Sequence, residues 1–348
     1  MYNQKILIDK KNNSVFDITK YFLSIMVVAI HCNLSPEILY PWLRLAVPLF
    51  FLISSFFLFK KIGKATSEEK NSIVWNYIKR NAILYLFWFV VLLPLAIHQQ
   101  HDIWIDEHNI FCILRFIRSL LFSSTFPASW YISSTITATV VVFYLSKKLN
   151  NAILLIISGA CYFLACVSSS YPFVVELVPV LKNILSVVGV FIPVPYNSFL
   201  VGIFWITCGK CIAESKHQIR TNKLIIMIII SAILLEIEYL FHVKLTNTIN
   251  SDLYFMLIPM STSIFILLCR IPAWENKYGV TLRKISTLYY VMHLSVLYVI
   301  RALLDRIYHI KIDTGLQFVA TLLIVTVLSI IILILEKNKK FSLLKYSH

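Results

Sequence analysis

Lys20 and His31 are two ionisable side chains in the first long apolar segment of the chain, FDITKYFLSIMVVAIHCN. A helix turns by about 100° per residue, so their spacing puts both side chains on one helical face, about 16 Å apart along the axis. An ionisable group inside a membrane-spanning helix costs a few kcal/mol, which makes it a functional candidate. Histidine is also well suited to proton transfer near neutral pH. The pair therefore predicts a pathway with functional groups at two depths.

Both residues also have simpler interpretations. Lys20 lies near one end of the segment, where its ammonium group can extend to the membrane surface. His31 lies near the other end, where a histidine can serve only to hydrogen-bond a neighbouring helix. Other polar residues inside apolar segments are Ser54, Ser55, Glu236, Glu238 and His293. The two glutamates are two positions apart, so at most one of them is expected to face a cavity at the depth of His31.

Membrane helices are the elements that must position these residues. Apolar residues make up 59% of the 348 positions and charged residues only 14%, about half the charged share of a soluble domain. Ten apolar runs are long enough to cross a hydrocarbon core. They lie at about 16–34, 42–59, 82–99, 128–146, 151–168, 196–213, 223–241, 253–270, 285–304 and 315–335. Because backbone polar groups in lipid must be paired within their own segment, the predicted fold is an all-α, polytopic integral membrane helical bundle of about ten transmembrane helices.

The basic residues indicate how this bundle is oriented. There are 32 Lys and Arg against 17 Asp and Glu, a formal net charge of +15. Placing the N-terminus in the cytoplasm leaves eight basic residues outside and 24 inside, as expected from the excess of positive charge in cytoplasmic loops. The eight are Arg44, Arg115, Arg118, Lys182, Lys244, Arg301, Arg306 and Lys311. Both termini are therefore expected to be cytoplasmic, and the basic excess indicates contact with anionic membrane lipid, with no need for nucleic acid.

Other site types and domain types are not favoured. The seven cysteines are odd in number and lie mostly in apolar runs, so we expect no disulfide framework, and the C-x-x-C at Cys208 and Cys211 has no second pair. His101, Asp102 and His108 can be imagined as metal ligands, but a solvated loop is the favoured interpretation and no metal is expected. The first apolar run has no signal-peptide cleavage pattern. We expect a single membrane domain over 1–348, with no separate soluble domain.

Together with Lys20 and His31, four further motifs resemble the membrane-bound acyltransferase-3 family, which acylates cell-envelope sugars. Lys20 and His31 match its basic residue, ten residues, then histidine. The other matches are VPLFFLIS at 47–54, YIKR at 77–80 before LYLFW at 84–88, Trp130-Tyr131, and STLYYVMH at 286–293. Ser55 stands where the family usually has glycine, and Asn81 and Ile83 follow Lys79-Arg80 without a second arginine. The chain also resembles the membrane portion of serine-racemase-like glycopeptide-resistance proteins, without their racemase domain.

The resemblance implies a membrane-bound O-acyltransferase that moves an acyl group from acyl-CoA, usually acetyl-CoA, to a hydroxyl of a cell-envelope carbohydrate or glycan intermediate. His31 would be the general base, with Lys20 at the inner end of the pathway. The residues expected to hold the CoA phosphates are Lys60, Lys61, Lys79 and Arg80. The residues expected to shape the pocket are Ser54, Trp130, Tyr131, Glu238 and His293, and either of the last two would orient His31. The expected location is a bacterial plasma membrane, crossed several times.

Several alternatives remain open at this point. Ten spans with ionisable groups also suit a transporter or flippase for a glycan intermediate or a small polar solute. A non-catalytic scaffold would leave the Lys20 and His31 pair unexplained. The acceptor, the choice between acetyl, succinyl and other acyl groups, and direct transfer against an acyl-enzyme are all undecided. So is the oligomeric state, a homo-oligomer included.

Overall fold

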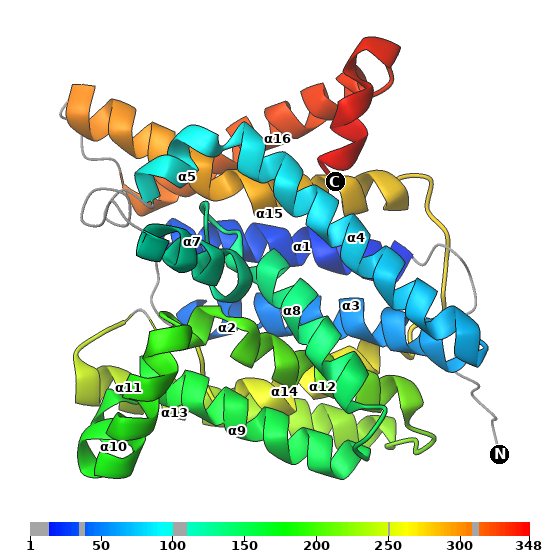
Figure 1. Ribbon diagram of the computed structural model, residues 1–348, viewed down its shortest axis with the longest axis vertical. Coiled ribbons are helices and arrows are strands. Elements are labelled where there is room, and N and C mark those ends of the chain that lie inside the picture. The colour runs from blue at the N-terminus through cyan, green and yellow to red at the C-terminus, as the bar shows by residue number, and fades with distance from the viewer. Residues whose placement is uncertain (1–13, 35–38, 100–109, 250, 308–312) are drawn as a thin grey trace. The chain divides into compact units, whose positions relative to one another are not determined.

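The computed structural model describes residues 14–34, 39–99, 110–249, 251–307 and 313–348 (Figure 1). Every regular element in these ranges is a helix, so the predicted all-α class is confirmed. The chain divides into two compact units. Unit one comprises the described parts of 1–50, 218–236 and 256–348, and unit two those of 51–217 and 237–255. The expectation of one membrane domain over the whole length stays a prediction.

Each of the ten predicted runs coincides with a helix or a pair of consecutive helices. The helices that correspond to them are α1 (Ser14–His31), α2 (Tyr40–Leu43) with α3 (Ala46–Gly63), α4 (Ser67–Val91) with α5 (Leu93–Gln99), α8 (Trp130–Leu145), α9 (Asn151–Ser169), α12 (Phe199–Glu214), α13 (Thr221–Thr246), α14 (Leu257–Leu268), α15 (Gly279–Arg301) and α16 (Thr314–Leu335). The remaining elements are α7 (Ile110–Phe122), α10 (Pro172–Leu177), α11 (Pro179–Phe191), η2 (Pro195–Asn197), η3 (Ala302–Ile307) and η4 (Lys339–Tyr346).

Length separates these helices into two groups. Among the described residues, six segments are long and apolar enough to cross a membrane: 14–31, 40–63, 151–169, 221–246, 279–304 and 314–335. The consecutive helices α4 and α5, which bend by 84° at their junction, would make a seventh. The helices α8 and α14 are apolar but shorter. A multi-pass membrane protein therefore agrees with the structure, whereas ten crossings and cytoplasmic termini stay predictions.

In unit one, α1 and α15 pack side by side and run in the same direction. Near the start of α1, the Ser286 hydroxyl donates to the backbone carbonyl of Lys20 at 2.8 Å. At its end, Arg301 donates to the backbone carbonyl of His31 at 3.2 Å. Residues later in α1 therefore contact residues later in α15, as in a parallel helix pair. This arrangement keeps one face of α15 along the face of α1 that carries the predicted pathway.

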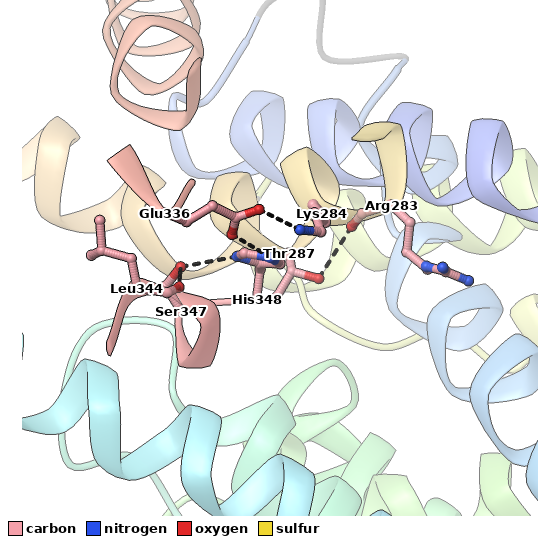
Figure 2. A network of polar contacts seen from close by, with 7 residues as sticks. All are labelled: Arg283, Lys284, Thr287, Glu336, Leu344, Ser347 and His348. Atoms are coloured by element: carbon pink, nitrogen blue, oxygen red, sulfur yellow. Dashed lines mark hydrogen bonds and ion pairs between the residues drawn. The ribbon is translucent and has the colours of Figure 1, made fainter. Parts of the chain in front are cut away.

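Helix α16 lies antiparallel to α15. Arg301, at the end of α15, donates from Nε to Gln317 Oε1 at 3.0 Å. At the opposite end, Lys284 Nζ lies 2.5 Å from Glu336 Oε1. Figure 2 shows how the C-terminal residues join this end, since His348 Nε2 lies 3.0 Å from the second oxygen of Glu336. The polar contacts thus anchor both ends of the helix pair, and between them the hydroxyls of Tyr289 and Thr326 share a hydrogen bond of 2.6 Å.

In unit two, α12 packs closely against two helices through glycines. A Cβ at Gly202 would come within 3.1 Å of Ala138 Cβ on α8. A Cβ at Gly209 would meet the side chain of Ser55 on α3 and would lie 3.1 Å from the carbonyl oxygen of Leu52. Ser55 is the position at which the related family usually has glycine. Its small side chain fits here because the residue that faces it is itself a glycine.

Two segments expected as connections are more helical than the sequence suggested. The segment between the predicted runs at 42–59 and 82–99 is mostly helix, because α3 continues to Gly63 and α4 begins at Ser67. Thr66 and Glu69 form a capping box at this start, in which each side chain pairs with the other residue's backbone N–H. The apolar stretch at 184–192, between the predicted runs at 151–168 and 196–213, lies mostly in α11.

The structure describes some, but not all, of the residues on which the metal and cysteine expectations depend. His101, Asp102 and His108 lie outside the described residues. Within the described ranges, no group of three or more His, Cys, Asp or Glu side chains could hold a metal ion. The cysteines whose side chains the structure describes are free thiols: Cys32, Cys161, Cys166, Cys208, Cys211 and Cys269.

Candidate active site

His31 and His293 lie together in unit one, one on α1 and one on α15. Their ring centroids are 5.1 Å apart and the ring planes are inclined by 37°. A second aromatic contact joins the same two helices, because the rings of Tyr21 and Tyr289 are 5.6 Å apart. His293 is 1% exposed, whereas His31 is only partly buried. The packing of α1 against α15 therefore brings together two histidines that are 262 positions apart in sequence.

The hydrogen bonds of His293 determine which of its ring nitrogens carries the proton. Nδ1 lies 2.7 Å from the carbonyl oxygen of Tyr290 and 3.0 Å from that of Tyr289. A carbonyl oxygen only accepts, so Nδ1 must donate and the neutral ring keeps its lone pair on Nε2. Within the part of the chain that the structure describes, Nε2 is buried and has no hydrogen-bond partner. The site thus contains a fixed and unused hydrogen-bond acceptor.

Arg301 supports the backbone of His31. His31 is the last residue of α1, so its carbonyl has no acceptor role within the helix, and Arg301 Nη2 donates to it at 3.2 Å. A cation at this end of a helix also interacts favourably with the helix dipole. The charges of Arg301 and Arg44 both act on the ring of His31. Two guanidinium groups therefore belong to the surroundings of this histidine.

In the sequence, Arg301 stands out only as one of the outside basic residues, and no pattern singles out Gln317. The structure shows that both belong to the surroundings of His31, because Gln317 holds the guanidinium of Arg301 through Oε1. A signal was present, since each is a polar residue near the end of an apolar run. Nothing in the sequence indicated that the end of α15 meets the start of α16, because this contact depends on the antiparallel packing of the two helices.

Lys20 lies on the same continuous helix as His31, so the helical geometry expected from their spacing applies. Its charge acts on Asp17, which is 5% exposed and lies 3.7 Å from Arg283 Nη1. Lys20 therefore belongs to a charged group at the start of α1. This group and the two histidines mark opposite ends of the helix.

Unit two brings together three of the motifs that the sequence singled out. The Ser54 hydroxyl lies 2.5 Å from the Tyr77 hydroxyl, which joins α3 to α4. The ring of Phe51 lies 4.5 Å from that of Tyr131 and 6.4 Å from that of Trp130. The motif at 47–54 therefore contacts, through its unit-two residues, both the motif at 77–80 and the Trp130-Tyr131 pair.

The four basic residues expected to hold phosphates lie on helices. Lys60 and Lys61 are in the last turn of α3, and the ammonium of Lys60 lies 5.7 Å from the centre of the Phe56 ring. Lys79 and Arg80 lie within α4, beyond its first three turns. Lys61, Lys79 and Arg80 are exposed. Their side chains are therefore accessible to a ligand.

Glu236 and Glu238 serve different partners, as their spacing on one helix requires. In unit one, Glu236 accepts a hydrogen bond from the indole N–H of Trp42. In unit two, Glu238 accepts from the Tyr171 hydroxyl and from the backbone N–H of Phe255, the latter at 2.7 Å. His293, one of the two residues expected to orient His31, has its ring in contact with that of His31.

Comparison with known proteins adds three findings. A sequence family described as an acyltransferase domain matches residues 13–334. A protein named amino-acid racemase, from Enterococcus faecalis, is 24% identical over 344 residues, which cover 94% of this chain and 47% of that protein. A serine/alanine racemase from Enterococcus gallinarum is 25% identical over 234 residues, covering 65% of this chain and 33% of that protein. The chain thus spans about half the length, or less, of these relatives. No solved structure matches.

Proposed function

Because this chain belongs to the acyltransferase-3 family, we propose that it moves an acyl group, usually acetyl, from acyl-CoA to a hydroxyl of a cell-envelope carbohydrate or glycan intermediate. Acyl transfer at a membrane follows from the family and from the apolar helices. The donor, the acceptor and the residue roles are the proposed part. The observation that carries these roles is the contact of His31 with His293, at 5.1 Å between ring centroids.

His31 is the proposed general base. A sugar hydroxyl is a weak nucleophile until its proton is removed as the oxygen attacks the thioester carbonyl, and a positioned base contributes about 10²- to 10⁴-fold. The new C–O bond forms, the C–S bond breaks, and the proton held by His31 passes to the departing thiolate of CoA. A route in which His31 first takes the acyl group itself uses the same residue and stays an alternative.

Four basic side chains are the proposed phosphate ligands of CoA: Lys60, Lys61, Lys79 and Arg80. Guanidinium and ammonium groups form strong, charge-assisted hydrogen bonds with phosphate oxygens. The exposure of Lys61, Lys79 and Arg80 supports this role, because an exposed cation can reach a ligand without first breaking buried contacts. Lys20 supplies positive charge at the inner end of the proposed pathway.

The proposed pocket residues have surroundings that suit them to shape a binding site. Trp130 and Tyr131 present aromatic rings beside Phe51, and Ser54 shares a hydrogen bond with Tyr77. Glu238 is held by Tyr171 and by the backbone of Phe255. Rigid aromatic and hydrogen-bonded side chains are typical of small-molecule sites. We assign these four residues to the pocket and, because the ring of His293 contacts that of His31, assign the orientation of His31 to His293.

The proposed setting is a bacterial plasma membrane, which the chain crosses several times and where its basic segments contact anionic lipid. Two relatives come from Enterococcus, which agrees with a bacterial source. Their names refer to amino-acid racemases, but this chain spans half or less of each, so we do not assign racemisation to it. Neither a metal nor nucleic acid is part of the proposal.

The direct experiment measures transfer of the acetyl group from labelled acetyl-CoA to a glycan by the purified protein in proteoliposomes. Mass spectrometry of envelope glycans from cells with and without the protein identifies the acceptor as the species that gains an acetyl or succinyl ester. We expect the ester to be missing from cells that lack the protein and to return when the parental chain is expressed in them. Glycan esters that are identical in the two strains, with no transfer in vitro, would contradict the function.

A transporter or flippase for a glycan intermediate or small polar solute is the second candidate. The 84° bend between α4 and α5 favours it, because broken helices are common at transporter binding sites. The two candidates differ in their need for a donor. Movement of a glycan across proteoliposomes that lack acyl-CoA would favour the transporter.

A further inference from the structure

We propose that His293 is a positioning residue, which accepts a hydrogen bond from a ring N–H of His31 and thereby leaves the lone pair of His31 on its other nitrogen. This inference rests on the proposed function, because it concerns how His31 becomes a base for acyl transfer. It assigns to His293 one atom, Nε2, and one tautomer. Both follow from contacts within unit one.

The tautomer of His293 is set by its own helix. Its Nδ1 donates to the carbonyl oxygens of Tyr289 and Tyr290, at 3.0 and 2.7 Å. The proton is therefore held on Nδ1, and Nε2 can only accept while the ring is neutral. Burial of a polar atom without a partner costs about 1–3 kcal/mol. A group that donates to Nε2 is therefore stabilising, and the ring of His31, whose centroid lies 5.1 Å from that of His293, carries an N–H that can do so.

The distance between the rings permits this bond. At a centroid separation of 5.1 Å, ring nitrogens that point toward each other come within hydrogen-bond reach. In the structure Nε2 of His293 has no hydrogen-bond partner among the described residues, but rotation about χ2 of His31 is soft, because that torsion has broad minima. Hydrogen bonds at catalytic groups are often loose before substrate binds. We expect the alignment to tighten when the acceptor is bound.

The consequence for the reaction concerns the nitrogen that remains. With one N–H of His31 engaged by His293, the other nitrogen carries the lone pair and faces the hydroxyl, as in other nucleophile and base pairs that a third group orients. The hydroxyl proton goes to that nitrogen and later to the thiolate of CoA. The proton on Nδ1 of His293 does not move. His293 touches neither substrate in this scheme.

The charged surroundings of His31 favour a neutral partner over a second cation. Arg301, at the end of α15, donates to the backbone carbonyl of His31 at 3.2 Å, and the charge of Arg44, which follows α2, also acts on the His31 ring. Because two guanidinium groups already raise the local potential, His293 is best suited to orient the base while it stays neutral. A carboxylate in the place of His293 would offset the positive charge of the two arginines and would orient the His31 ring less well.

Asn and Gln replacements at His293 distinguish the roles of its two ring nitrogens. The amide of Asn can reach the position of Nδ1 and donate to the carbonyls of Tyr289 and Tyr290, but it places nothing at Nε2. The amide oxygen of Gln can reach the position of Nε2 and accept from His31. We expect His293→Asn to lower kcat by about 10²- to 10⁴-fold with little change in the KM for acetyl-CoA, and His293→Gln to keep kcat within about tenfold of the parental value.

A second measurement reads the tautomer without relying on activity. Nitrogen NMR of histidine-labelled protein distinguishes a protonated from an unprotonated ring nitrogen, and subtraction of the His31→Gln spectrum identifies the signals of His31. We expect one defined tautomer of His31 in the parental protein and in His293→Gln, and a mixture in His293→Asn. The same change should appear as a shifted pH profile of kcat in the Asn variant.

The outcomes are distinct. A His293→Asn protein with parental kcat, or a His31 tautomer that is the same in all three proteins, would overturn the inference. Equal loss in both variants with unchanged tautomers would show that His293 only supports α15. If the parental protein transfers no acyl group, the proposed function fails, but the NMR comparison still decides whether His293 orients His31.

Discussion

Arg301 and His31 are joined by a hydrogen bond of 3.2 Å from the guanidinium to the last carbonyl of α1. This contact fixes the end of the helix on which the proposed base lies. It also ties α1 to α16, because the same guanidinium donates to Gln317 at 3.0 Å. The position of His31 thus depends on three helices, each of which the sequence predicts, although it does not indicate that they pack together.

Replacing Arg301 with Leu should therefore destabilise the protein and reduce acyl transfer. A hydrogen bond from a charged group contributes about 1.5–3 kcal/mol, and its loss leaves an unpaired carbonyl at the end of α1. The expected result is a lower midpoint of thermal unfolding in detergent. Arg115→Leu is the control, because Arg115 is exposed on α7. Equal midpoints for the parental and Arg301→Leu proteins would mean that this contact does not hold the helix end.

His31 should be essential for acyl transfer but not for insertion. We expect His31→Ala and His31→Gln to accumulate in the membrane and to lose transfer, because each keeps the span and removes the base. Gln retains hydrogen bonding and approximate volume, so it would rescue a purely structural histidine. The measurement is the rate of transfer from labelled acetyl-CoA by purified protein. A near-parental rate for His31→Gln would rule out the mechanism proposed for this residue.

Lys20 tests whether charge is needed at the inner end of the proposed pathway. If charge alone is required, Lys20→Arg should retain substantial transfer, whereas Lys20→Ala should lose it. The same proteoliposome assay gives both rates. Loss in both variants would indicate a need for the ammonium group itself, and activity in both would return Lys20 to the simpler role of a side chain that reaches the membrane surface.

Arg80 should contribute to donor binding. We expect Arg80→Ala to raise the KM for acyl-CoA more than it changes acceptor use, because a lost phosphate contact weakens ground-state binding. Lys148→Ala is a matched control, since Lys148 is also an exposed cation but lies between α8 and α9. If the two variants give the same donor KM as the parental protein, the basic residues of α4 serve topology alone.

Membrane orientation can be checked with single cysteines in a background from which the natural cysteines have been removed. We expect Ser67→Cys, at the start of α4, to resist a membrane-impermeant thiol reagent in intact cells. Asn183→Cys, exposed on α11, should react. Permeabilised cells provide the control, since both positions should then be labelled. The reverse pattern in intact cells would overturn the orientation and the assigned side of the donor.

Gly209 should not tolerate a side chain. A Cβ there would meet Ser55 and would lie 3.1 Å from the carbonyl oxygen of Leu52, so Gly209→Ala requires the Ser55 side chain and the neighbouring backbone to shift. Overpacking of this kind costs about 1–3 kcal/mol. Gly159→Ala is the control, because nothing lies within 4 Å of a Cβ at that position on α9. Thermal unfolding should distinguish the two variants, and equal midpoints would contradict the close approach.

The confirmed part of the sequence analysis rests on local patterns. Apolar runs predicted the helices, because a backbone in lipid must pair its polar groups within the segment. Motif order predicted membership of the acyltransferase-3 family and the likeness to serine-racemase-like proteins, which the comparisons confirm. The sequence did not predict that α4 begins as early as Ser67, because the predicted run begins at 82. The segment before 82 is rich in charged residues, a composition that is typical of loops.

The sequence by itself determined that Lys20 and His31 lie on one helical face, because their spacing along one helix is a local property. Only the tertiary structure decided that His293 contacts His31, that Glu238 pairs with Tyr171, and that Arg301 holds the end of α1. Each of these contacts joins residues far apart along the chain. Their formation depends on which helix faces pack together, and apolar helices of similar composition carry no local pattern that specifies their neighbours.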